Sequence, residues 1–154
     1  MYIALFLRAS SVCGSGKPAS QRLEATSPPG FSTHSHLFFV TDRVIGTRFL
    51  VDTGADVSVL PQSRSEQRQS SPFTLQAVNQ SPISSYGEKS MTLDLGLRRS
   101  FRWIFILAEI PMPILGADFL AHFSIQVDVR NRLLIDTTTS LCVQALLSVG
   151  NTQP

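Results

Sequence analysis

The chain has 154 residues, a length that suits one domain with additional segments at its ends. Hydrophobic residues make up 43% of it and charged residues only 16%, against about 25% in an average soluble domain, so a highly charged disordered chain is excluded. The net charge of +2 is too small to indicate nucleic-acid binding by bulk electrostatics. No apolar run approaches the roughly 18 residues of a transmembrane helix, so we expect no membrane span.

Residues 8–36 are rich in Ser, Pro, Gly and Ala, and they predict a disordered arm or linker, which we extend over 1–36. The apolar run at 2–7 is short for a signal peptide and has no basic residue before it, so secretion is not expected. Cys13 and Cys142 lie far apart and have no metal-ligand spacing, which favours a reducing, cytoplasmic compartment.

From residue 37 onward, short β-prone apolar runs alternate with turn residues. Alternation at 91–95 predicts a half-buried strand, whereas the run at 101–110 is apolar on both faces and predicts a strand buried on both sides. A helix of one or two turns is predicted at 117–123, and the state of 141–149 is left open between strand and helix. The predicted strands are 37–40, 48–51, 58–60, 73–78, 83–87, 91–95, 101–110, 125–129 and 133–135.

Many short strands with one short helix predict an all-β barrel or sandwich-like domain. Two pairs of strands, 37–40 with 48–51 and 125–129 with 133–135, have hairpin spacing. We divide the chain into the arm 1–36, a domain 37–140 and a C-terminal tail 141–154.

The most informative segment is Phe-Leu-Val-Asp-Thr-Gly-Ala-Asp at 49–56, where Asp52 follows three apolar residues. A carboxylate at the end of a buried strand costs several kcal/mol unless it is paired or protonated. Thr53 offers a hydroxyl and Gly54 permits a tight turn. Taken alone, the triplet is far more typical of an ordinary turn, because Asp and Gly are common turn formers.

Two further features lie downstream in a fixed order. A predicted hairpin is centred near 79–87, and Ile-Leu-Gly-Ala-Asp-Phe-Leu follows at 114–120. Together with 49–56, they resemble the retropepsin family of aspartic proteases, and above all the proteases of gypsy-class LTR retrotransposon polyproteins. The resemblance covers about 37–135. It implies a retropepsin-like closed barrel that forms half of a two-fold dimer.

The resemblance also implies roles for individual residues. Asp52 would be the catalytic carboxylate, Thr53 would lock two active-site loops together, and Gly54 would offer its carbonyl to substrate. A flap hairpin at 83–87 would close over the substrate. The full set is catalytic Asp52, Thr53 and Gly54; substrate-binding Ala55, Asp56, Ile83, Tyr86 and Gly87; and supporting Ile114, Leu115, Gly116 and Asp118.

Some of these roles have an alternative. Asp56 would face substrate backbone or a local ion pair, but it suits a turn-capping carboxylate equally well. Asp118 would cap or anchor the short helix. Retroviral members often have an arginine directly after the supporting glycine, where this chain has Ala117, so an ion pair built on that arginine is missing or replaced.

The chain contains a single Asp-Thr-Gly, so it supplies half of an aspartic protease site. Asp136-Thr137-Thr138 lacks the glycine and is interpreted as a strand end. The resemblance therefore implies a homodimer that cleaves polypeptide, in particular its own polyprotein, with no metal and no cofactor. The alternative is a catalytically inactive relic of the same fold that acts as a dimerisation or binding module.

The remaining polar features point to no other function. Arg98, Arg99 and Arg102 form a basic cluster that we interpret as a solvated strand edge. The three histidines, at 34, 36 and 122, supply too few ligands for a zinc site. Nucleic-acid binding through the few charges of the arm would be weak and salt-sensitive, so it is not expected.

Overall fold

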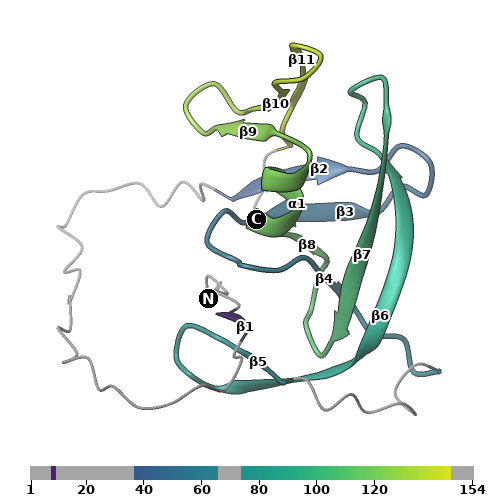
Figure 1. Ribbon diagram of the computed structural model, residues 1–154, viewed down its shortest axis with the longest axis vertical. Coiled ribbons are helices and arrows are strands. Elements are labelled where there is room, and N and C mark those ends of the chain that lie inside the picture. Colours follow the sequence, from purple (N-terminus) through teal and green to yellow (C-terminus); the bar gives the residue numbers. More distant parts are fainter. Residues whose placement is uncertain (1–7, 10–36, 66–73, 147–154) are drawn as a thin grey trace, which may run out of the picture.

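The structure is a computed structural model that describes residues 37–65 and 74–146, together with the backbone of residues 8–9 (Figure 1). Predictions that fall on 10–36, 66–73 and 147–154 lie outside the described residues. Within the described ranges, no helix is long and apolar enough to cross a membrane. The elements are β1 (Arg8–Ala9), β2 (Phe38–Thr41), β3 (Arg48–Val51), β4 (Val59–Pro61), β5 (Thr74–Gln76), β6 (Pro82–Asp94), β7 (Ser100–Ala108), β8 (Ile114–Leu115), α1 (Ala117–His122), β9 (Ile125–Asp128), β10 (Leu133–Asp136) and β11 (Leu141–Gln144).

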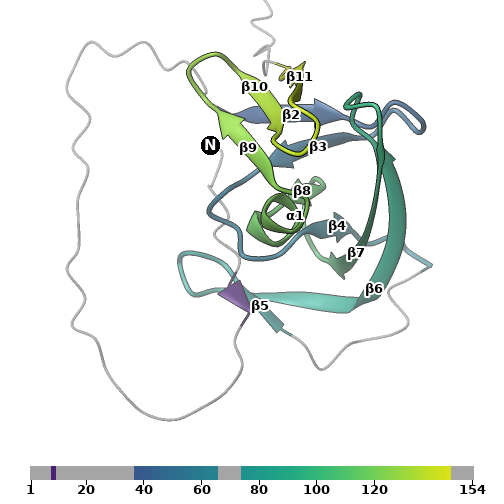
Figure 2. The same cartoon turned by 45° about the horizontal axis from the view of Figure 1, so that its top comes forward.

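Eight strands form one curled sheet in the order β1-β5-β6-β7-β4-β8-β3-β2 (Figure 2). The predicted N-terminal hairpin is confirmed, with β2 and β3 antiparallel and Phe38 opposite Val51. β8 runs parallel to β3, and β4 runs parallel to β7. The sheet ends at β1 and β2 without joining them, so the prediction of a closed barrel is wrong and the sheet is an open half-barrel.

A second, three-stranded sheet follows α1 and has the order β11-β10-β9. It confirms the predicted hairpin of β9 and β10. Residues 141–144, whose state the sequence left open, form β11 antiparallel to β10. A backbone hydrogen bond from Leu146 N–H to the carbonyl of Phe39, 2.8 Å long, joins the end of this segment to β2. The C-terminal sheet is thereby attached to the first hairpin of the half-barrel.

The core of the half-barrel comes from alternating positions on β6 and β7 and from the short helix. Leu93 and Phe101 are opposite each other and completely buried, and each such side chain contributes roughly 1.5–3 kcal/mol by its burial. The helix confirms the prediction and buries Phe119 and Leu120. The expectation that 101–110 is buried on both sides is wrong at Ile104, which is 58% exposed. Its side chain lies on the face of β7 opposite to that of the buried Phe101 and Phe105.

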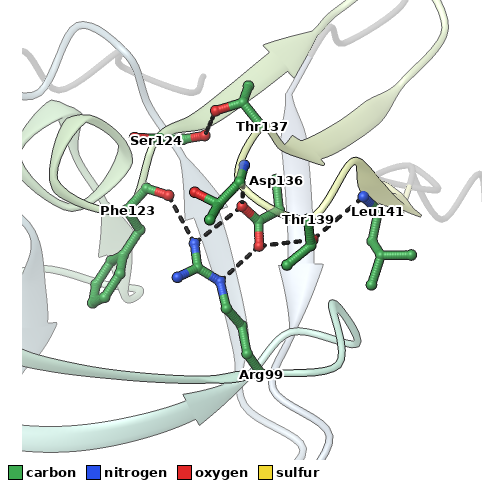
Figure 3. A network of polar contacts seen from close by, with 8 residues as sticks. Arg99, Phe123, Ser124, Asp136, Thr137, Thr139 and Leu141 are labelled. Atoms are coloured by element: carbon green, nitrogen blue, oxygen red, sulfur yellow. Dashed lines mark hydrogen bonds and ion pairs between the residues drawn. The ribbon is translucent and has the colours of Figure 1, made fainter.

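Arg99, which lies in the turn between β6 and β7, reaches across to the C-terminal sheet (Figure 3). Its guanidinium contacts the completely buried carboxylate of Asp136 twice, at 2.6 Å from Nε and 3.0 Å from Nη2. Nη2 also donates to the carbonyl of Phe123 at 2.9 Å. The backbone N–H of Thr138 and the hydroxyl of Thr139 donate to the same carboxylate, each at 3.0 Å. The interpretation of Arg99 as a solvated charge is therefore wrong, since it is the partner of a buried acid.

This network predicts a specific pH dependence of stability. Burial alone raises the pKa of Asp136, but the hydrogen bonds from Arg99, Thr138 and Thr139 outweigh it and hold the pKa below its ordinary value of 3.8. A depressed pKa stabilises the folded chain fully above 3.8, and this contribution is lost as the pH falls through the lowered value. We expect the difference in unfolding free energy between the wild type and Asp136→Asn to narrow below pH 3.8 in urea titrations. A difference that stays constant down to the acid transition would contradict this role.

Candidate active site

Asp52 lies directly after β3, where two parallel strands hold it in place. β3 pairs with β8, with Leu50 opposite Ile114 and Val51 opposite Leu115. The backbone N–H of Asp52 donates to the carbonyl of Leu115 at 3.0 Å. The predicted supporting residues Ile114 and Leu115 are both buried beside the strand that carries Asp52. They fix the backbone from which its carboxylate projects.

The loop after Asp52 closes a tight turn around its carboxylate. Oδ1 of Asp52 accepts a 2.9 Å hydrogen bond from the N–H of Gly54, and the carbonyl of Asp52 accepts one of 3.1 Å from Ala55. Asp52 is half-buried, so its carboxylate is neither sealed inside the subunit nor freely solvated. Thr53 is exposed at the turn. The loop thus presents one oriented carboxylate and one exposed hydroxyl at the surface of the chain.

The other predicted substrate contacts on this loop differ from each other in accessibility. Ala55 is completely buried in a small apolar cluster with Leu75 of β5 and Ile114 of β8. Its side chain is therefore closed to a ligand in this conformation, contrary to the prediction, because β5 covers it. Asp56 is exposed, and within the described residues its side chain makes no hydrogen bond or ion pair.

Gly116 joins β8 to α1 and lies close to the backbone of the loop that follows Asp52. A Cβ atom at this position would lie 2.6 Å from the carbonyl oxygen of Val57 and 2.8 Å from that of Ala55. The next residue, Ala117, donates its N–H to the carbonyl of Ala55 at 2.7 Å. The glycine therefore lets the start of the helix lie against the segment that follows Asp52.

Gly116→Ala is expected to lower the free energy of unfolding by about 1–3 kcal/mol, because the two carbonyl groups are backbone and cannot move aside without shifting the loop. Urea unfolding measures this. Ala121→Ser, at an exposed position of the same helix, is the control and should change stability by less than about 0.5 kcal/mol. Equal stability of Gly116→Ala and the control would show that the loop tolerates the extra methyl group.

Ser58 connects the loop that follows Asp52 to the helix α1. The sequence prediction did not include it among the site residues. Its hydroxyl donates to Oδ1 of Asp118 at 2.6 Å and accepts from the N–H of Gly116 at 2.9 Å. Its own N–H donates to Oδ2 of Asp118 at 3.0 Å. Oδ1 of Asp118 also accepts a 2.7 Å hydrogen bond from the N–H of Phe119 in the first turn of α1, so the contacts fit both predicted roles, capping and anchoring. The available signal was one polar residue inside the apolar run 57–60.

The hairpin of β5 and β6 lies over this loop, but its tip is not where the sequence placed it. The turn is formed by residues 77–81, closed by hydrogen bonds from Ala77 N–H to the Ser81 carbonyl at 3.0 Å and from Gln80 N–H to the Ala77 carbonyl at 2.8 Å. Val78, at this turn, is 54% exposed. The exposed tip therefore precedes the predicted stretch 83–87.

The three residues predicted for the flap fall into two groups. Ile83 pairs with Leu75 inside the hairpin and packs against the cluster that contains Ala55. Tyr86 and Gly87 lie further along β6, at a bulge between Ser85 and Glu88, and Tyr86 packs against the main core. The structure brings Ile83 to the loop that follows Asp52 and leaves Tyr86 and Gly87 away from the tip, because the turn closes at 77–81.

The described part of the chain contains no group of three or more His, Cys, Asp or Glu side chains that could hold a metal ion. Asp136, the second aspartate followed by threonine, is completely buried and paired with Arg99, so it cannot serve as a second acid for this site. The loop therefore carries Asp52, which is held by backbone contacts under the hairpin, and the exposed Asp56 four residues later.

A curled β-sheet, an Asp-Thr-Gly loop backed by a Leu-Gly segment and a covering hairpin define the class of single-lobed aspartic protease folds. The model of the retroviral aspartyl protease family matches residues 39–128, and the chain belongs to that family. No curated protein matches the chain.

Two solved structures resemble the fold. The retroviral protease-like domain of Ddi1 from Leishmania major has a TM-score of 0.55 and 18% identity, covering 71% of this chain and 94% of that one. The EIAV protease in complex with the inhibitor HBY-793 has a TM-score of 0.45 and 20% identity, covering 71% of this chain and 99% of that one. The first likeness supports the retropepsin-like fold.

Proposed function

We propose that this chain is the aspartic endopeptidase of a gypsy-class LTR retrotransposon polyprotein and that it acts as a homodimer on polypeptide, including its own polyprotein. The observation that carries the proposal is the half-buried Asp52, held by backbone hydrogen bonds on a loop that the β5–β6 hairpin covers. The retrotransposon origin rests on the length and order of the two motifs at 49–56 and 114–120.

In the proposed dimer, Asp52 of each chain meets its counterpart across a two-fold axis. Two carboxylates about 3 Å apart cannot both ionise, so the pair shares one proton. The ionised member removes a proton from a bound water, which attacks the scissile carbonyl, while the protonated member donates to the carbonyl oxygen. A proton then passes to the leaving nitrogen. Neither a metal nor a covalent intermediate is required.

The dimer is required because each chain has one Asp-Thr-Gly, and the interface must therefore be isologous. The exposed Thr53 would bond across this interface, and Gly54 would offer its carbonyl to substrate. Asp56, exposed beside them, would bond to substrate backbone. Ile114, Leu115, Gly116 and Asp118 hold the loop, and Ile83 belongs to the hairpin that excludes water.

A mixing experiment tests the shared site. Adding an equal amount of the Asp52→Asn chain to a fixed amount of wild type leaves wild-type homodimers as about one quarter of all dimers, so cleavage should fall to about one half. The substrate is an unfolded protein or peptide at mildly acidic pH. The control adds the same amount of the Asp128→Asn chain, which keeps Asp52 and can exchange subunits, so cleavage should rise about twofold instead of falling. Unchanged cleavage after adding Asp52→Asn would rule out a site built from two chains.

The second candidate is a retropepsin-fold module that dimerises or binds a partner without cleaving. The likeness to the Ddi1 domain concerns the fold and leaves this candidate open. Size-exclusion chromatography with and without a statine inhibitor separates the two proposals. A dimer that cleaves no substrate and ignores the inhibitor favours the module, and a dimer stabilised by the inhibitor favours the protease.

A further inference from the structure

β5 is a strand of three residues with two different neighbours in the sheet. One of its edges pairs with β6, with Leu75 opposite Ile83. Its other edge pairs with β1, antiparallel, with Arg8 opposite Gln76 and Ala9 opposite Leu75. Both views show β1 beside β5 at the end of the large sheet (Figures 1 and 2). A segment far upstream in the sequence is thus the outermost strand on the hairpin.

This edge adjoins the loop of Asp52. Leu75, in register with Ala9, is completely buried in the same small cluster as Ala55, three residues after Asp52. β6 is occupied on its other side by β7. The edge of β5 that faces away from β6 is therefore the side of the hairpin at which an extended peptide can form main-chain hydrogen bonds. Edges of this kind bind peptides by strand addition.

We propose that the β5 edge is a strand-accepting surface for polypeptide and that the chain's own segment around Arg8 and Ala9 occupies it, in competition with substrate. The inference rests on the proposed protease function. Residues 10–37 connect β1 to β2, where the half-barrel begins, and these 28 residues span up to about 90 Å when extended, so the pairing of β1 with β5 is possible within one chain. A ladder of two residues is short, so incoming polypeptide can displace it.

The variant that tests this is Arg8→Pro with Ala9→Pro in the full chain, because proline has no N–H to donate to a ladder. Gln21→Pro with Arg22→Pro is the matched control: it also removes one arginine and adds two prolines, and it lies away from the paired positions. Amide hydrogen exchange at residues 74–76 should be faster in the first variant than in the control. Equal exchange in both would overturn the pairing.

Binding is then measured with a fluorescein-labelled synthetic peptide of residues 3–12, read by fluorescence anisotropy. It should bind the Arg8→Pro, Ala9→Pro chain about five- to tenfold more tightly than the control, since the edge is then vacant in every molecule. Equal affinity would overturn the competition. Protection at 74–76 that rises with chain concentration would show pairing between chains and overturn the assignment to the same chain.

Cleavage assays separate this inference from the proposed function. If the protein is a protease, the double-proline variant should show a KM lowered by about the same five- to tenfold factor with kcat unchanged. An unchanged KM would overturn the competition with substrate. If no variant cleaves any substrate, the protease proposal fails, while exchange and peptide binding still decide whether the segment occupies the β5 edge.

Discussion

Asp52→Asn should abolish peptide cleavage, lowering kcat by at least about 10²-fold, without unfolding the chain. The asparagine side chain has nearly the shape of aspartate, and its amide oxygen can still accept the 2.9 Å hydrogen bond from the N–H of Gly54. It cannot remove a proton from water. The measurement is kcat on an unfolded or peptide substrate at mildly acidic pH, with circular dichroism to show that the fold persists.

The control for this variant is Asp128→Asn, the same chemical change on β9 in the C-terminal sheet. The two oxygens of the Asp128 carboxylate each accept one hydrogen bond from Asn131, and an amide oxygen keeps one of them. The lost bond is at the surface and away from Asp52, so the activity of this variant should equal that of the wild type. Wild-type cleavage by Asp52→Asn would place the reacting acid elsewhere. Equal losses in both variants would show that the assay responds to general disturbance of the fold.

Arg99→Met should lower the free energy of unfolding by about 3–5 kcal/mol, the usual cost of leaving a buried charge without its partner. Asp136 is 0% exposed and keeps only the donors on Thr138 and Thr139 when the guanidinium is removed. Because the Arg99 side chain is 31% exposed, we expect the lower end of that range. Urea unfolding at neutral pH is the measurement.

Two further variants separate the buried charge from general loss of packing. Arg102→Met changes an exposed arginine that donates a 3.4 Å hydrogen bond to the hydroxyl of Ser90 on the surface, and it should cost less than about 0.5 kcal/mol. Arg99→Met combined with Asp136→Leu removes both charges and should recover much of the loss. A double variant less stable than Arg99→Met alone would indicate that packing, and not the unpaired carboxylate, causes the effect.

Local patterns were enough to predict much of the fold. The hairpins of β2 with β3 and β9 with β10 follow from two apolar runs on either side of a turn, and the short helix follows from the change of period after Gly116. The loop at 49–56 was chosen as the candidate site from the order of two motifs, and the family match confirms the class of protein. The roles of the individual site residues remain predictions.

What the sequence did not predict depends on contacts between distant segments. The tip of the hairpin was placed too far along the chain. The turn lies at 77–81, and two segments that were predicted as separate strands form one long strand, β6, with a bulge between Ser85 and Glu88. The pairs of Ser58 with Asp118 and Arg99 with Asp136 span 60 and 37 positions, and periodicity carries no information about such partners. The apolar run 141–149 left its state open, and β11 takes its alternating exposure from antiparallel pairing with β10.

The burial of Ala55 under Leu75 has a consequence for how a polypeptide could enter. Leu75 and Ile83 of the hairpin share an apolar cluster with Ala55 of the loop, so lifting the hairpin exposes apolar surface to water. A polypeptide that enters under the hairpin must therefore cover this apolar surface itself, because exposing it to water costs free energy.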